Sequence, residues 1–160
     1  MRLFKAILLI AALFALGMPG ALAAEPAKLV GMVKTPLTLD AATLGALPVK
    51  TLDVSFATAT GSEKASYTGV LLWDVVNRAG LINGKGRNAR LRHTLLITSS
   101  DGYAIALALG EFDPGYGNRQ VLLAYKSDKG GVSYDALRLL VPGDVHSGRS
   151  VRGIASIEVK

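Results

Sequence analysis

The chain has 160 residues, a formal net charge of +6 and no cysteine. Without cysteine it can supply no disulfide, thiolate nucleophile, cysteine-ligated zinc site or iron–sulfur cluster. The basic residues are dispersed and are not interleaved with aromatic residues, so the composition does not support nucleic-acid binding. It suits a small anionic ligand or an acidic partner surface.

Residues 1–23 are typical of a secretory signal peptide. Arg2 and Lys5 precede an uncharged run, which ends in an Ala-Leu-Ala cleavage pattern at Ala23. We expect cleavage after Ala23, with Ala24 as the near alternative. The other interpretation is a membrane anchor, but the apolar core of about ten residues is shorter than the roughly 20 that span a bilayer.

Export through this signal predicts a periplasmic chain with one domain over residues 24–160. Loss of Arg2 and Lys5 leaves 16 basic and 12 acidic residues, a net charge near +4. No later segment is apolar and long enough to span a membrane, so we expect a soluble mature chain.

Strands and short helices alternate in the first half of this domain. A strand is predicted over 28–33, and Asp40 is positioned to cap a short helix that ends near Gly45. Residues 50–56 alternate between apolar and polar, as in a half-buried strand. The small, polar residues 57–66 predict a long loop. Apolar residues then recur at helical spacing over 71–79, before a basic, glycine-rich connection.

The second half is dominated by strands. An Asp-Gly pair at 101–102 predicts a tight hairpin turn with positive φ at both positions, between strands over 94–98 and 103–109. Alanines alternate with larger apolar residues in the second strand, which predicts that both of its faces are covered. Further strands are expected over 121–126, 137–141 and 151–159. The whole pattern predicts an α+β domain of mixed β-sheets with a few short helices.

Few residues offer catalytic chemistry. His93, in a basic segment, is expected at the surface, and no helical pair of metal ligands accompanies either histidine. His146 lies in a glycine- and arginine-containing loop over 142–152, whose backbone N–H groups and guanidinium groups suit an anion. The alternative is a solvated hairpin loop. No phosphate-binding loop, dinucleotide fingerprint or defensible Ser-His-Asp order is present.

Two aromatic residues are candidates for the walls of a binding pocket. Trp73 departs from the apolar face of its predicted helix, so it could edge a pocket and stack on a flat ring. Tyr67, just before that helix, is a second candidate. The alternatives are a partly buried packing residue for Trp73 and a core-edge tyrosine for Tyr67.

Seven segments, in this order, resemble the molybdopterin-binding domain of the sulfite-oxidase family. The resemblance implies a sulfite-oxidase-like fold over most of the mature chain. The segments are Val30-Gly31-Met32-Val33, Leu37-Thr38-Leu39-Asp40, the stretch from Tyr67 to Val76, Asp101-Gly102-Tyr103, Leu122-Leu123-Ala124-Tyr125, the stretch from Leu137 to Gly143, and Gly148-Arg149-Ser150-Val151-Arg152.

One feature of the family is missing. Catalytic members hold molybdenum through a cysteine in the loop after the strand that resembles 51–56, whereas residues 57–62 here read Ala-Thr-Ala-Thr-Gly-Ser. The resemblance therefore implies a stand-alone exported member that binds a pterin or molybdopterin-type ligand without a metal and without catalysis. Some exported members resemble regulators that read free pterins and act on membrane signalling proteins, such as cyclic-di-GMP enzymes. The alternatives are a molybdopterin-dependent oxidoreductase, an accessory subunit of one, or a scaffold that only binds another protein.

On this hypothesis the ligand lies between residues 57–67, Trp73 and the loop over 144–152. Trp73 or Tyr67 would stack on the ring, Arg149 and Arg152 would donate to a carbonyl or phosphate, and an aspartate would pair with ring N–H groups. No catalytic or metal-ligating residue is expected. The expected ligand-binding residues are Trp73, Tyr67, Thr58, Asp101, Asp113, His146, Ser147, Gly148, Arg149 and Arg152.

Overall fold

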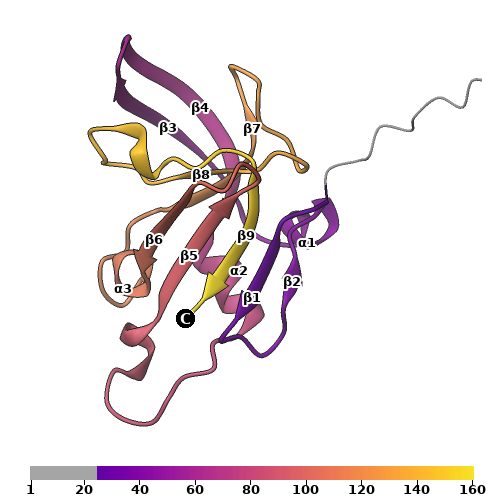
Figure 1. Ribbon diagram of the computed structural model, residues 1–160, viewed down its shortest axis with the longest axis vertical. Helices are drawn as coiled ribbons and strands as arrows, with labels where there is room; N and C mark the ends of the chain where they lie inside the picture. The colour runs from indigo at the N-terminus through magenta and orange to yellow at the C-terminus, as the bar shows by residue number, and fades with distance from the viewer. Residues whose placement is uncertain (1–24) are drawn as a thin grey trace, which may run out of the picture.

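A computed structural model describes residues 25–160 (Figure 1). The predicted signal peptide over 1–23, its cleavage site and its alternative as an anchor lie outside the described residues. Within the described part of the chain, no helix is both long and apolar enough to cross a membrane.

Two β-sheets form the body of the domain. The first has the order β2-β1-β9-β5-β6, with β1 parallel to β9 and the other neighbours antiparallel. The second is antiparallel, in the order β3-β4-β7-β8. The strands are β1 Lys28–Gly31, β2 Leu37–Thr38, β3 Val49–Thr58, β4 Gly61–Leu71, β5 Thr94–Ser99, β6 Ala104–Ala108, β7 Leu122–Ser127, β8 Arg138–Leu140 and β9 Ile154–Val159.

Short helices connect these strands, as the sequence predicts. They are α1 Ala41–Gly45, α2 Leu72–Ala79 and α3 Leu109–Phe112, with single 3-10 turns at η1 Ala89–Arg92 and η2 Ser147–Arg149. Asp40 caps α1, because its carboxylate accepts the Thr43 N–H at 2.8 Å. Gly80 ends α2 with a positive φ of 71°, which a glycine adopts without strain.

Residues 57–66 are not the loop that their polarity predicts. β3 runs on to Thr58, and β4 starts at Gly61, so the two strands pair along their whole length with a two-residue turn. Figure 1 shows this hairpin extending to one end of the molecule. The small polar residues occupy its tip because side chains there cover little of the core.

The 101–102 hairpin is confirmed, but its turn differs from the prediction. Only Gly102 has a positive φ, of 88°. The Gly102 N–H donates to Ser99 O and the Ser99 N–H to Tyr103 O, which makes a three-residue loop ending in a left-handed glycine. The predicted cover over the alanine face of β6 is also wrong, because Ala104, Ala106 and Ala108 are exposed.

Apolar residues form two clusters on opposite faces of the second sheet. The main cluster lies between the two sheets and α2, with Ile97, Val76 and Leu123 fully buried. The second lies under the β3–β4 hairpin and contains Phe56 and Leu122. Adjacent residues of β7 thus point into different clusters, as alternation along a strand requires.

His93 is buried, not at the surface as predicted. Its Nδ1 lies 3.0 Å from Lys160 O, and its Nε2 lies 3.1 Å from Asn83 Oδ1. The basic residues around it, Arg90 and Arg92, belong to η1 and are at least partly exposed. The basic composition of this segment therefore does not predict that the His93 side chain points into the protein.

Candidate functional site

The loop over 144–152 lies against the end of the β3–β4 hairpin. The Ala57 N–H donates to Val145 O at 2.8 Å, and Ala57 and His146 form a parallel bridge. Tyr103 Oη donates to Gly148 O at 2.6 Å from the other side. The structure therefore brings together two of the three segments expected to surround the ligand.

Glu63 is the centre of the charged groups at this junction. Its Oε1 accepts from Arg138 Nη1 at 2.6 Å and from Tyr67 Oη at 2.7 Å, and its Oε2 accepts from Arg152 Nη2 at 3.0 Å. Arg138 also donates from Nε to Ser150 Oγ at 2.9 Å. We call Glu63, Tyr67, Arg138 and Arg152 the Glu63 network.

The network combines a buried cation with an exposed one. The Arg138 side chain is 4% exposed, the Glu63 side chain 27%, and the Arg152 side chain 66%. The hydrogen bond from Arg138 is the largest cause that lowers the pKa of Glu63, which falls to about 2. Glu63 is therefore ionised at every physiological pH, and one side of the network faces solvent.

Tyr67 belongs to this network but is not a pocket wall. Its ring is almost fully buried in the second core cluster, and the Arg138 guanidinium lies over it at 5.1 Å from the centroid. Burial, and then the bond to Glu63, raises the pKa of its hydroxyl. Stacking of a ligand ring on Tyr67 would require Arg138 to move.

Arg149 does not join Arg152. Its Nε and Nη2 bind the two carboxylate oxygens of Asp144 at 2.8 and 2.6 Å, and its Nη1 binds Glu111 Oε2 at 2.9 Å. These carboxylates raise the pKa of Arg149, and the Arg149 hydrogen bonds lower that of Asp144. Arg119 completes this second group, at 3.2 Å from Asp144. The guanidinium of Arg149 thus ties its own loop to α3.

Five other expected residues have local roles or positions near the junction. Asp101 accepts from the Ser99 hydroxyl and from the Tyr103 N–H at 3.0 Å, which lowers its pKa and stabilises the hairpin loop. Thr58 Oγ1 donates to Gly61 O at 3.2 Å within its own turn. His146 is exposed on the loop, just before Ser147 and Gly148 of η2.

Trp73 and Asp113 lie in a different part of the molecule. Trp73, on α2, lines a hollow of about 350 Å³ together with Lys34, Asn77, Gly80, Leu81, Asn83 and Arg90. Asp113 is 1% exposed and forms an ion pair with Arg90, whose Nε lies 2.9 Å from its Oδ2. Figure 1 shows the α2–β5 connection, over 80–93, at the end opposite the tip of the β3–β4 hairpin.

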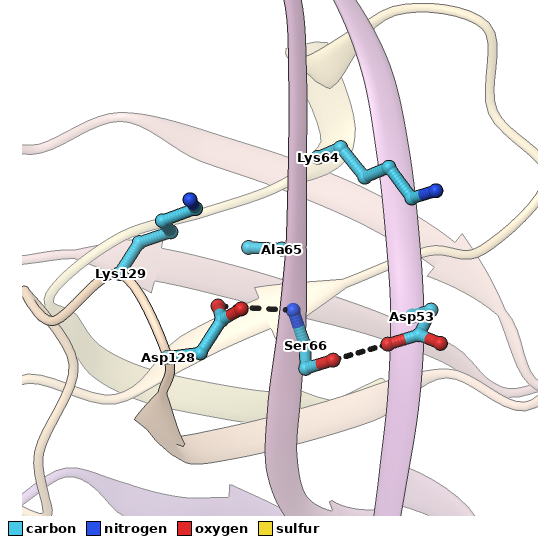
Figure 2. Close-up of a pocket in the computed structure, with 6 residues that line it drawn as sticks. All are labelled: Asp53, Lys64, Ala65, Ser66, Asp128 and Lys129. Atoms are coloured by element: carbon cyan, nitrogen blue, oxygen red, sulfur yellow. Dashed lines mark hydrogen bonds between the residues drawn. The ribbon is translucent and has the colours of Figure 1, made fainter.

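Figure 2 shows another hollow, of about 420 Å³, beside the β3–β4 hairpin. Asp53 and Asp128 approach Ser66 from opposite sides: the Ser66 hydroxyl donates to Asp53, and its N–H donates to Asp128 at 3.1 Å. Lys64 and Lys129 also line the hollow, so its lining has two carboxylates and two ammonium groups. None of the expected ligand-binding residues lines this hollow.

Four residues at these sites are not among those predicted from the sequence: Glu63, Arg138, Lys34 and Arg90. Arg138 had a readable signal, because it is the only charged residue in the apolar run over 137–141, and a charge in a buried strand requires a partner. Glu63 gave none, since its segment was interpreted as a loop. Lys34 and Arg90 line the same hollow only because of the path of the α2–β5 connection.

The chain's donor groups do not fit the molybdenum of catalytic members of the family that the sequence resembles. Positions 57–62 supply hydroxyl and backbone groups, and the sequence has no thiolate. Within residues 25–160, no group of three or more His, Asp or Glu side chains is placed to hold a metal ion.

Comparison with solved structures identifies a protein with a similar fold. The crystal structure of the sulfane dehydrogenase SoxCD from Paracoccus pantotrophus matches with a TM-score of 0.62 and 16% sequence identity, over 82% of this chain and 37% of that chain. This chain thus spans little more than a third of the matched structure. No protein-family model matches the sequence, and a search of curated proteins finds no match. The α+β architecture and its likeness to a sulfite-oxidase-family structure are confirmed.

Proposed function

We propose that this protein is an exported, non-catalytic binding protein for a pterin or molybdopterin-type ligand. The observation that carries the proposal is the pairing of ionised Glu63 with exposed Arg152, at the junction of the hairpin and the 144–152 loop. The sulfite-oxidase-like fold and the missing cysteine support it. Trp73 and Asp113 lie elsewhere and are not part of this site.

The Glu63 network offers chemistry that suits a pterin. The pyrimidine edge of a pterin presents N–H donors beside a carbonyl acceptor. Glu63 Oε2 has one protein donor, Arg152, and retains a lone pair for a ligand N–H. Arg152 has further N–H groups in solvent that can donate to the carbonyl or to a phosphate. Arg138, behind Glu63, fixes the carboxylate in place.

Calorimetric titration of the purified protein with a reduced pterin tests this proposal. We expect saturable binding that weakens about tenfold or more in Arg152→Ala, since a hydrogen bond to a charged group contributes on the order of 1.5–3 kcal/mol. Arg78→Ala, which removes an exposed arginine from α2, is the matched control and should bind as the wild type does. Absence of binding to any pterin would refute the proposal.

The proposal also includes the cellular location of the protein and the protein that it regulates. The pattern of residues 1–23 supports export to the periplasm. There the ligand-bound protein would regulate a membrane signalling protein, as the family resemblance implies. Detection of the chain in a periplasmic extract, and pterin-dependent co-purification with a membrane protein, are the expected results.

A molybdopterin-dependent oxidoreductase, or an accessory subunit of one, is the second candidate. The fold likeness to a dehydrogenase favours it, while the absent thiolate argues against a metal held by this chain. Elemental analysis of protein from a molybdate-fed host separates the two candidates. Stoichiometric molybdenum would support the enzyme, and a molybdenum-free protein that binds a pterin would support the binding protein.

A further inference from the structure

The hollow beside α2 and the 80–93 connection has the features of a second ligand site. We call this region, opposite the tip of the β3–β4 hairpin in Figure 1, the α2 end of the molecule. We propose that the hollow lined by Trp73, Lys34 and Arg90 binds a small aromatic phosphate, with the ring against the indole and the phosphate between the two cations. Its volume of about 350 Å³ is within the range of small-molecule sites. This proposal does not depend on pterin binding at the Glu63 network.

The charge around the hollow selects an anion. No carboxylate is among its lining residues. In residues 25–160, Lys34 forms no ion pair within 4.0 Å. The connection over 80–93, which forms one wall, contains four basic residues and no acidic one: Lys85, Arg87, Arg90 and Arg92. Of these four only Arg90 lines the hollow, and it is paired with Asp113, so among the described residues Lys34 is the unpaired cation at this concave surface and attracts anions to it.

Arg90 is held in place by an ion pair and by packing. Its Nε lies 2.9 Å from Oδ2 of the almost fully buried Asp113, without the geometry of a hydrogen bond, and the guanidinium lies 5.2 Å from the centroid of the Tyr116 ring. Gly115 allows this approach, because a Cβ there would lie 2.7 Å from Arg90 Nη2. The Arg90–Asp113 pair is formally neutral, so the net positive charge at the hollow comes from Lys34. The Arg90 side chain is 41% exposed, and its remaining N–H groups can donate hydrogen bonds to the phosphate.

Trp73 supplies the flat wall. It packs on the main core cluster and is only partly buried, so part of the indole remains at the hollow. Asn77 lies one helical turn further along α2, on the same side. Its amide can pair with a polar substituent of a ring that stacks on Trp73. Indole, amide and cation together favour an aromatic phosphate over inorganic phosphate.

Trp73 is the only tryptophan of the chain, so its fluorescence reports directly on this hollow. The experiment titrates the purified full protein with phenyl phosphate, inorganic phosphate and benzyl alcohol. We expect a saturable fluorescence change with phenyl phosphate, weaker binding of inorganic phosphate, and no saturation with benzyl alcohol in the same concentration range.

Variants of Lys34 and Arg90 test whether these two residues bind the phosphate group. Lys34→Ala should raise the Kd for phenyl phosphate about tenfold, as loss of one charge-assisted contact predicts. Arg90→Lys keeps the charge beside Asp113 but loses the planar fork, and should also weaken binding. Lys50→Ala, an exposed lysine on β3, is the matched control and should bind as the wild type does.

Three outcomes would overturn the proposal. The first is no saturable change with phenyl phosphate in the wild type, and the second is equal affinity in Lys34→Ala and Lys50→Ala. The third is equal affinity for phenyl phosphate and inorganic phosphate, which would remove the role assigned to Trp73.

Discussion

The two ends of the molecule use basic residues in different ways. At the hairpin end, Arg138, Arg149 and Arg152 each contact a carboxylate, in two groups centred on Glu63 and Asp144. At the α2 end, Lys34 and most of the cations of the connection have no acidic partner in the described part of the chain. Paired charges hold chain segments together, whereas unpaired charges at a hollow remain available to a ligand.

Because of this difference, substitutions at the two sites should affect protein stability and ligand affinity differently. Changes in the Glu63 network should alter both folding and ligand affinity, because the same side chains serve both. Removal of Lys34 at the Trp73 hollow should alter affinity and leave folding almost unaffected, because Lys34 is exposed and forms no ion pair in the described part of the chain.

Glu63→Ala should be the most destabilising of these changes. It leaves the buried Arg138 guanidinium without its carboxylate, and loss of one partner from a buried ion pair costs about 3–5 kcal/mol. Urea unfolding measures the loss. Glu158→Ala, at a half-buried glutamate whose one ion pair among residues 25–160 is with Lys160, is the control and should change the free energy of unfolding by less than about 0.5 kcal/mol. Equal losses in the two variants would contradict the role given to Glu63.

Acid should weaken the hairpin end next. Since folding lowers the pKa of Glu63 from its ordinary 4.5 to about 2, its stabilising effect is complete above pH 4.5 and is lost as the pH falls toward 2. The expected loss is roughly 2–3 kcal/mol. In Glu63→Gln the free energy of unfolding should fall less steeply over this range, and an unchanged slope would show that other carboxylates cause it. Asp144, whose pKa is also lowered, acts in the same direction.

Arg149→Ala should destabilise the protein more than Arg152→Ala. Arg149 makes a two-pronged contact with Asp144 and a third with Glu111, so we expect a loss of about 1–2 kcal/mol. Arg152 is 66% exposed, and an exposed pair contributes at most about 1 kcal/mol. Thermal unfolding of the two variants gives the order, and the reverse order would mean that the Glu63 network, not the Asp144 group, holds the loop.

Lys34→Ala should have the smallest effect on stability. Lys34 is exposed and forms no ion pair within the described residues, so its removal should change the free energy of unfolding by less than about 0.5 kcal/mol. The phenyl phosphate titration of the same protein should nevertheless weaken. A large loss of stability would show that Lys34 has a structural role.

Local signals in the sequence predicted most of the fold. Asp40 marked the start of α1, Gly80 the end of α2, and alternation over 50–56 gave the core of β3. The hairpin tip was missed because Ala, Thr, Gly and Ser carry no apolar alternation, even though they pair along two strands. β6 was misjudged because alternating alanines do not reveal whether another element covers them.

The candidate site was predicted less completely, because contacts between distant segments decide it. Proximity of the 57–67 and 144–152 segments followed from the family resemblance, and the structure places them together. Trp73 was assigned to the same site, yet β4 carries the chain away from Glu63 before α2 begins. Which carboxylate each arginine would reach could not be predicted, since Arg149 and Arg152 are near in sequence and bind different partners.

Titration of one reduced pterin into three proteins tests the central claim most directly. The wild type and Lys34→Ala should bind with equal affinity, and Arg152→Ala should bind about tenfold more weakly or worse. This result would assign the pterin to the Glu63 network. Loss of binding in Lys34→Ala with full binding in Arg152→Ala would contradict the claim and assign the pterin to the hollow beside Trp73.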